Sequence, residues 1–294
     1  MTASTSFREI ARYILLHLRR SQAARPEPTL GQPDTPPAPI VSLTTIPSRI
    51  GRLRPALNSL LDQSLRPARI YLAVPTHSRR EGRAYAIPEW LRRYPLVTIL
   101  AAEKDWGPAT KLIPALRCHE ADPDRAILAV DDDNVYPRRF IETFARYARE
   151  LPDAALSLRG WPIPESRRWK DSREFLGTQI TSPVETDVIT GCGGILVRPR
   201  FFAPAFFDSS TAPPQAFFVD DLWISGHLAR KGIRKYVIPY AEGHIYLPSL
   251  ATLFGPALDK TANRTGLNND ALIDHFRRDW RSLACADKGK EGTG

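Results

Sequence analysis

Three consecutive aspartates, Asp131, Asp132 and Asp133, directly follow the apolar run at 126–130. Adjacent carboxylates repel one another, so we expect a positive group beside them. Two carboxylates at positions i and i+2 can aim at one point where a loop turns, and hard divalent cations prefer carboxylate oxygens. The spacing therefore predicts a metal site at Asp131 and Asp133. Asp132 is the alternative ligand, because three consecutive aspartates allow two registers of the motif. A solvated acidic turn before a helix that starts near Pro137 is the alternative interpretation.

A second acidic pair, Asp220 and Asp221, stands at the start of a helix predicted over 221–232. Each carboxylate raises the pKa of the other, whereas the helix N-terminus lowers the pKa of both. An ionised carboxylate at such a place can take a proton from a substrate hydroxyl. The alternative is a pair that only caps the helix.

The elements that would position these aspartates alternate between strands and helices from Ile40 onward. We predict strands over 40–45, 69–74, 96–100 and 126–130, and helices over 48–63, 108–121 and 138–150. This alternation indicates an α/β fold with a mostly parallel central sheet and helices on both faces. Ligands of such sheets bind beyond the carboxyl ends of the strands, which is where the three aspartates lie. The second half is less regular, with strands predicted over 154–159, 193–199 and 234–239.

The N-terminal segment has helical periodicity. Its apolar stripe consists of Phe7, Ile10, Ala11, Ile14, Leu15 and Leu18. Residues 1–25 hold five arginines against one glutamate. The pattern predicts an amphipathic helix within 1–24 that either packs on protein or lies on an anionic membrane surface through residues 7–20. Six prolines between 25 and 39 predict an extended linker, so we expect the helix to be tethered to the main domain and not part of its core.

Composition narrows the classes of function. The 294 residues are enough for one large core, and 43% hydrophobic and 25% charged residues are typical of a globular protein. No run approaches the roughly 20 apolar residues that cross a bilayer. Three scattered cysteines, Cys118, Cys192 and Cys285, favour a reducing compartment. The net charge of +9 suits anionic partners, but no nucleic-acid-binding motif is present. We expect a cytoplasmic protein without a nucleic-acid partner, peripheral on the cytoplasmic face of the membrane if the first helix binds lipid.

Several stretches together resemble the GT-A-fold glycosyltransferases of the family 2-like, DxD type. They are the strand–loop–helix–strand segment at 41–75, EKDWGPATKLIPAL at 103–116, VDDDNVYP at 130–137, GCGGILVRPRFF at 191–202 and VDDLWISGHLARKGI at 219–233. The likeness covers Ile40 to about Leu247, and the order and spacing of the pieces carry it. We therefore expect a GT-A-like (Rossmann-like) domain over 40–284, followed by a disordered tail at 285–294.

The resemblance implies a metal-dependent transfer of a sugar, with inversion, from a nucleoside-diphosphate sugar to a hydroxyl of a glycan or lipid-linked glycan. Mn²⁺ or Mg²⁺ would bridge the two phosphates and neutralise the leaving group. By resemblance, Asp131 and Asp133 hold the metal and His244 is its third ligand. Asp221 is the base, and Asp220 orients the acceptor or the protein.

The resemblance also implies contacts with the donor. Thr44, Thr45 and Arg49 lie in the loop after the first strand, and Asp131 and Asp132 are further donor contacts. Asp105 and Trp106 are expected at the nucleoside, and Lys111 at the diphosphate, where a cation stabilises developing charge. Arg49 and Lys111 could equally be surface charges, and Trp106 and His244 could be structural. Two other functions remain open: a metal-dependent phosphatase or nuclease, and a catalytically inactive module on a GT-A-like frame that binds membrane or polyanions.

Overall fold

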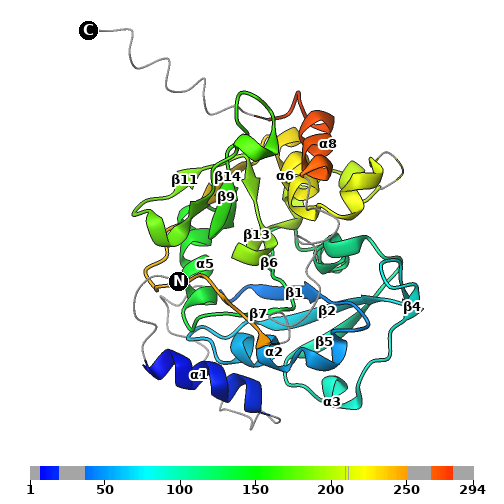
Figure 1. Ribbon diagram of the computed structural model, residues 1–294, viewed down its shortest axis with the longest axis vertical. Coiled ribbons are helices and arrows are strands. Elements are labelled where there is room, and N and C mark those ends of the chain that lie inside the picture. Colours follow the sequence, from blue (N-terminus) through cyan, green and yellow to red (C-terminus); the bar gives the residue numbers. More distant parts are fainter. Residues whose placement is uncertain (1–6, 20–36, 209, 211, 251–265, 281–294) are drawn as a thin grey trace.

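The computed structural model describes residues 7–19, 37–208, 210, 212–250 and 266–280. At its centre is an eight-stranded sheet in the order β11-β14-β8-β13-β6-β1-β2-β5 (Figure 1). The strands are β1 (Ile40–Thr44), β2 (Arg69–Pro75), β5 (Val97–Ala102), β6 (Ile127–Ala129), β8 (Ala154–Ser157), β11 (Val184–Glu185), β13 (Ile195–Val197) and β14 (Arg234–Val237).

Most neighbouring strands of this sheet are parallel. β1 pairs with β2 and β6, β2 pairs with β5, and β8 pairs with β14, all in parallel. β13 runs antiparallel between β6 and β8, and β11 runs antiparallel to β14 at one edge. Because β1, β2, β5 and β6 all run the same way, their carboxyl ends share one edge of the sheet. The expectation of a mostly parallel α/β sheet is confirmed.

Two hydrophobic cores lie on opposite faces of the sheet because strand side chains alternate between the faces. In β6, Leu128 joins one core, whereas Ile127 and Ala129 join the other. The first core contains side chains of α2 (Arg54–Leu61), α3 (Glu89–Arg92) and α5 (Phe140–Glu150). The second contains side chains of α4 (Ile113–Arg117), α6 (Asp220–Arg230) and α8 (Leu267–His275). Helices therefore cover both faces, as predicted.

Prolines divide two of the predicted helices. The helix predicted over 48–63 begins as a 3₁₀ turn and continues as α2, with Pro55 in its first turn. The helix predicted over 108–121 is likewise a 3₁₀ helix followed by α4, which has Pro114 in its first turn. Proline lacks an N–H group and cannot continue the preceding hydrogen-bond ladder, so each proline starts a new helix.

Among the described residues, seven short strands form three further small sheets, in the orders β10-β9-β12, β15-β7 and β3-β4, and several 3₁₀ helices lie between the longer elements. The short strands are β3 (His77–Ser78), β4 (Arg83–Ala84), β7 (Asn134–Val135), β9 (Arg159–Trp161), β10 (Phe175–Leu176), β12 (Val188–Ile189) and β15 (Leu247–Pro248). The 3₁₀ helices are Ile50–Arg52, Gly107–Lys111, Trp169–Asp171, Gly177–Gln179, Gly191–Gly193, Pro199–Phe201, Pro204–Phe206 and Pro214–Phe217. β7, which directly follows the three aspartates, pairs antiparallel with β15.

The N-terminal segment forms α1 (Phe7–Leu18), which packs against α2. Arg12 forms an ion pair with Asp62 at 2.9 Å and donates a hydrogen bond to the carbonyl of Tyr136 at 3.1 Å. The amide of Asn58 donates to the carbonyls of Leu16 and Arg19 at 2.7 and 3.0 Å. The sequence predicts that the linker alone tethers this helix to the main domain. In the structure, side-chain contacts also fix the helix to the domain.

Most of the predicted linker at 25–39 and the whole predicted tail at 285–294 lie outside the described residues. Within the described part of the chain, no helix combines the length and the apolar character that a membrane crossing requires.

Candidate active site

A cleft of about 590 Å³ opens at the carboxyl edge of the parallel strands. Its wall includes six carboxylates and four cationic side chains. The carboxylates are those of Asp105, Asp131, Asp132, Asp133, Asp220 and Asp221, and the cations are Arg49, Arg80, Lys111 and Arg159. The two acidic groups singled out in the sequence, about 90 positions apart, therefore face one cavity.

The turn that carries the first acidic group is fixed by hydrogen bonds. The hydroxyl of the fully buried Tyr136 accepts from the Asp131 amide at 2.9 Å and donates to the Asp131 carbonyl at 3.0 Å. The Thr45 hydroxyl donates to Asp132 at 2.5 Å. One guanidinium nitrogen of Arg49 lies 2.8 Å from both Asp132 and Asp133. The positive group expected beside the aspartates is therefore present, and it comes from the loop after β1.

The second acidic group is linked to the first by Lys111. The Lys111 ammonium lies 2.7 Å from Asp131 and 2.9 Å from Asp220, and its side chain is only 4% exposed. The amide of Gly191 donates a hydrogen bond to Asp221 at 2.8 Å. A Cβ atom at position 191 would overlap the Lys111 ammonium, so glycine is required for this close approach.

Three of these carboxyls have raised pKa values. Burial, together with Asp132 and Asp131, raises the pKa of Asp133 to about 7, although Arg49 opposes the shift. Burial raises the pKa of Asp132 in the same direction. Burial and then the neighbouring Asp220 raise the pKa of Asp221 to about 8 against the effect of Lys111. Burial is the largest cause in each case, so these three carboxyls hold a proton more tightly than exposed aspartates do.

The cations in the cleft differ in how well their charge is balanced. Burial disfavours the Lys111 ammonium, but Asp131, Asp220 and Asp221 outweigh this effect and hold its pKa well above the usual range. For Arg80, burial and the nearby Arg49 guanidinium lower the pKa. Lys111 is thus matched by carboxylates, whereas for Arg80 burial and the neighbouring Arg49 outweigh the nearby carboxylates.

The donor atoms suit a hard divalent cation in type. Asp131 and Asp133 present carboxylate oxygens to the cleft. No group of three or more histidine, cysteine or acidic side chains is arranged to hold a metal in the described part of the chain. Mg²⁺ commonly takes only one or two protein carboxylates and completes its shell with water and substrate phosphates. The aspartate pair fits that type of site.

The structure brings most of the predicted donor residues to the cleft. Thr44, Thr45, Arg49, Asp105 and Lys111 line it together with the aspartates. Asp105 also fixes a turn, since its carboxylate accepts from the Arg79 and Gly107 amides, each at 2.7 Å. Lys111 is occupied by two carboxylates, so its contact with a diphosphate remains a prediction.

Trp106 and His244 are not among the residues that line the cleft. Trp106 is 7% exposed and belongs to the core that contains α4 and α6, where its apolar ring is buried. His244 has its Nδ1 atom 3.9 Å from Glu9 on α1. The geometry gives no support to nucleoside stacking by Trp106 or to metal ligation by His244.

Several lining residues were not identified from the sequence. Arg80 and Tyr85, which follow β2 in the chain, line the cleft together with Arg159, Cys192 and Tyr246. The Arg159 guanidinium donates to Cys192 at 3.0 Å and to the Tyr246 hydroxyl at 3.4 Å. Arg159 follows β8 within two residues, so the rule that located Asp131, a charged residue at a strand's end, could have found it. No local pattern marks Tyr246.

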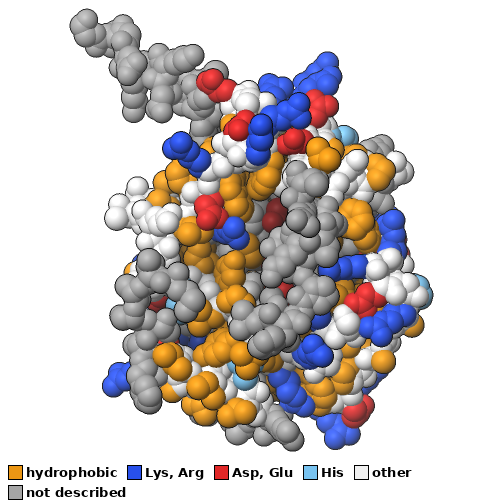
Figure 2. Space-filling model, viewed as in Figure 1, with side chains coloured by type: hydrophobic (Ala, Val, Ile, Leu, Met, Phe, Trp, Pro, Cys, Tyr) orange, Lys and Arg blue, Asp and Glu red, His pale blue; other side chains and the backbone are white. Residues whose placement is uncertain are grey.

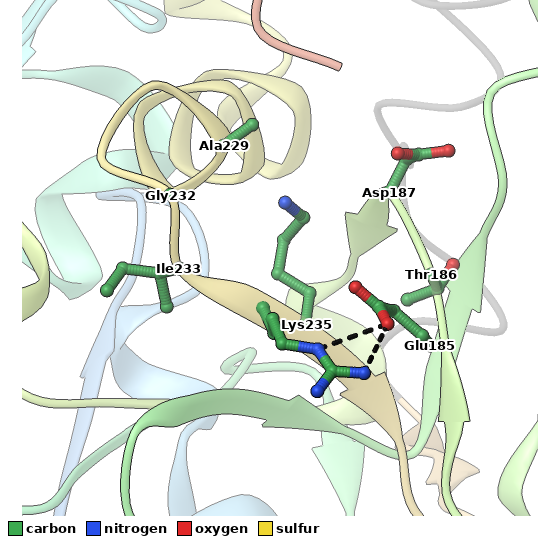
Figure 3. Close-up of a pocket in the computed structure, with 8 residues that line it drawn as sticks. Glu185, Thr186, Asp187, Ala229, Gly232, Ile233 and Lys235 are labelled. Atoms are coloured by element: carbon green, nitrogen blue, oxygen red, sulfur yellow. Dashed lines mark hydrogen bonds and ion pairs between the residues drawn. The ribbon is translucent and has the colours of Figure 1, made fainter. Parts of the chain in front are cut away.

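A second hollow, between β11, β14 and α6, has a volume of only about 10 Å³, room for a single water molecule (Figure 3). Lys235 extends toward α6 near Ala229, and the Arg234 side chain pairs with Glu185 at 2.7 Å. Burial raises the pKa of Asp187 beside it to about 6. This hollow is too small for an organic substrate.

Comparison with known proteins does not assign a family. No family model matches the chain, and a search of curated proteins finds no relative. The fold and the cleft define a mixed α/β protein with an acidic, partly buried site at the carboxyl edge of its sheet.

Proposed function

We propose that this chain is a GT-A-type glycosyltransferase that moves a sugar from a nucleoside-diphosphate sugar to a hydroxyl of a glycan or lipid-linked glycan. One observation carries the proposal: the acidic turn at 131–133 and the acidic helix start at 220–221 face the same cleft, with Lys111 between them. A transferase of this kind needs one group to hold the donor phosphates and another to activate the acceptor.

The charges in the cleft support a metal–diphosphate donor. The cleft wall carries six carboxylates and four cationic side chains. A divalent cation held by Asp131 and Asp133 would offset this excess of carboxylates, and the cationic side chains, Arg80 among them, would contact a diphosphate beside it. When bound, Mn²⁺ or Mg²⁺ would stabilise the negative charge of the departing nucleoside diphosphate.

Asp221 is the proposed base. The Gly191 amide holds one of its oxygens at 2.8 Å, which fixes the carboxylate toward the cleft. Its pKa is raised to about 8, so the base form of Asp221 grows as the pH approaches that value, and this carboxylate has a higher proton affinity than that of an ordinary aspartate. Asp221 would take the proton of the acceptor hydroxyl as that oxygen attacks the sugar carbon from the side opposite the leaving phosphate. A single displacement of this kind inverts the configuration.

The donor site is tested by thermal unfolding with a panel of nucleoside diphosphates, with and without Mn²⁺. We expect the melting temperature to rise with one nucleotide, only when metal is present, because ligands that bind the native state stabilise it. Asp133→Ala should abolish the rise. Asp153→Ala, at a side chain that is 81% exposed, is the matched control and should retain it. No rise with any nucleotide would contradict the donor site.

The base is tested separately with Asp221→Asn. This variant should keep the metal-dependent nucleotide shift and lose transfer of the sugar, because only the proton acceptor is removed. Normal turnover in Asp221→Asn would refute its role as the base while leaving the donor site intact. Loss of both properties would mean that Asp221 supports the fold of the cleft.

A further inference from the structure

An exposed apolar surface covers the outer side of α1. Ile10, Ile14, Leu15 and Leu18 are 47%, 50%, 64% and 68% exposed, and Leu250 is 46% exposed. Figure 2 shows hydrophobic side chains gathered in the region of α1 at the lower left of the molecule. Among the described residues six large hydrophobic side chains are exposed, and five of them belong to this α1 surface. Such a concentration indicates a binding surface more than a random scatter of apolar residues.

The orientation of α1 is fixed by the side that faces the protein. Leu16, which interrupts the polar side of the helix in the sequence, is 2% exposed and packs on the domain. The ion pair between Arg12 and Asp62 lies on that inner side. The Tyr13 hydroxyl donates to the carbonyl of Pro248 at 2.6 Å. These contacts turn the predicted apolar stripe outward and hold it there.

Leu250 extends the surface beyond the helix. Its amide donates to Nε2 of His17 at 3.1 Å, while Nδ1 of His17 lies 2.8 Å from the Tyr13 carbonyl. One imidazole tautomer, protonated at Nδ1, satisfies both contacts. The α1 surface therefore combines two segments of chain that are more than 230 positions apart.

We infer that the α1 surface docks on an anionic lipid membrane. At 3.6 residues per turn, Arg8 and Arg19 lie along the border of the apolar stripe next to Leu15, and Arg8 is exposed. Arg20 and Arg25 follow in the sequence. An apolar helix face edged with arginine matches the boundary between lipid chains and negatively charged headgroups.

A second copy of the chain is a poorer match for this surface. A helix of 12 residues presents a narrow strip, whereas stable dimers bury about 800 Å² per partner. Two copies related by a twofold axis would also bring the arginine borders close together, and like charges at an interface are unfavourable.

The test is co-sedimentation of the full chain with vesicles of phosphatidylcholine alone or mixed with phosphatidylglycerol. We expect binding to the mixed vesicles, weakening as salt is raised. The double variant Ile14→Gln/Leu15→Gln should reduce partitioning about tenfold or more, because it removes two aliphatic side chains from the lipid contact. Leu267→Gln, at a leucine that is 66% exposed on α8, is the matched control and should bind like the original chain.

Three results would overturn the inference. They are no sedimentation with either vesicle, equal sedimentation of the double variant, and a concentration-dependent dimer in gel filtration that the double variant abolishes. All variants should first show the unfolding midpoint of the original chain, since the substituted positions are on the surface. The test requires no nucleotide or sugar, so its outcome is independent of the proposed transferase activity.

Discussion

The two acidic groups of the cleft are neutralised in different ways. At the turn, Asp132 and Asp133 share Arg49, whose side chain is 22% exposed. At the helix start, Asp220 is paired with Lys111, and these side chains are 10% and 4% exposed. The cation of the first group is therefore in partial contact with solvent, whereas the cation of the second group is enclosed by the protein. From this contrast we predict a ligand-binding role for the turn and mainly a framework role for the Lys111 ion pairs.

The largest effect is expected from Lys111→Met. Removing the buried ammonium leaves Asp131 and Asp220 without their cation, and breaking a buried ion pair costs about 3–5 kcal/mol of the free energy of unfolding. Urea denaturation measures the loss. Lys170→Met, at an exposed lysine, should leave the free energy of unfolding nearly unchanged. Equal stabilities of the two variants would remove the distinction between framework and binding group.

The change in the free energy of unfolding per pH unit should be next in size. The pKa values of Asp133 and Asp221 are raised to about 7 and about 8, so the folded chain binds these protons more tightly than the unfolded chain. The stability that these protons provide is present at low pH, and the free energy of unfolding therefore falls as pH rises from about 4 to about 8. Each group contributes at most about 1.4 kcal/mol per pH unit. Asp133→Asn should flatten the plot of the free energy of unfolding against pH below pH 7, as measured by urea denaturation at each pH. Asp153→Asn should leave the plot unchanged.

Gly191→Ala tests the support of Lys111 without changing any charge. The new methyl group would overlap the Lys111 ammonium and lie 3.0 Å from an Asp131 oxygen, so both must move. Such overpacking typically costs about 1–3 kcal/mol. Gly51→Ala is the control, because a methyl group at position 51 meets no atom within 4 Å. A loss of stability that is the same at both positions would argue against the close approach.

Arg49→Gln should have the smallest effect on the free energy of unfolding, about 1 kcal/mol, because Arg49 is more exposed than Lys111 and a glutamine amide can still donate a hydrogen bond to the aspartates. The response of this variant to Mn²⁺ provides a second comparison of the two acidic groups. Mn²⁺ should recover the melting temperature of Arg49→Gln, since a metal can replace the missing charge at the turn, but it should not recover that of Lys111→Met. Recovery of both variants, or of neither, would contradict the different roles of the two groups.

The sequence predicted the sheet and the acidic turn well because both depend on local patterns. An apolar run followed by aspartates marks a strand and its carboxyl end, and the strands and helices of the first half form close to the predicted ranges. The surroundings of Lys111 could not be predicted, since they require Gly191, 80 positions away, to approach without a side chain. Similarly, helical periodicity grouped the residues of α1 by face. Which face turns inward depends on Asp62 and Asn58, which no pattern within α1 reveals.

The segment at 247–250 links α1 to the acidic turn through hydrogen bonds on both of its sides. On one side the Tyr13 hydroxyl of α1 holds the Pro248 carbonyl, and on the other the Ser249 amide donates to the Asp133 carbonyl at 2.8 Å. β15 also pairs with β7, directly after that turn. A force on α1 would therefore act on the backbone of Asp133 through two hydrogen bonds and a short strand. We therefore expect removal of α1 to weaken the support of the cleft wall that carries Asp133.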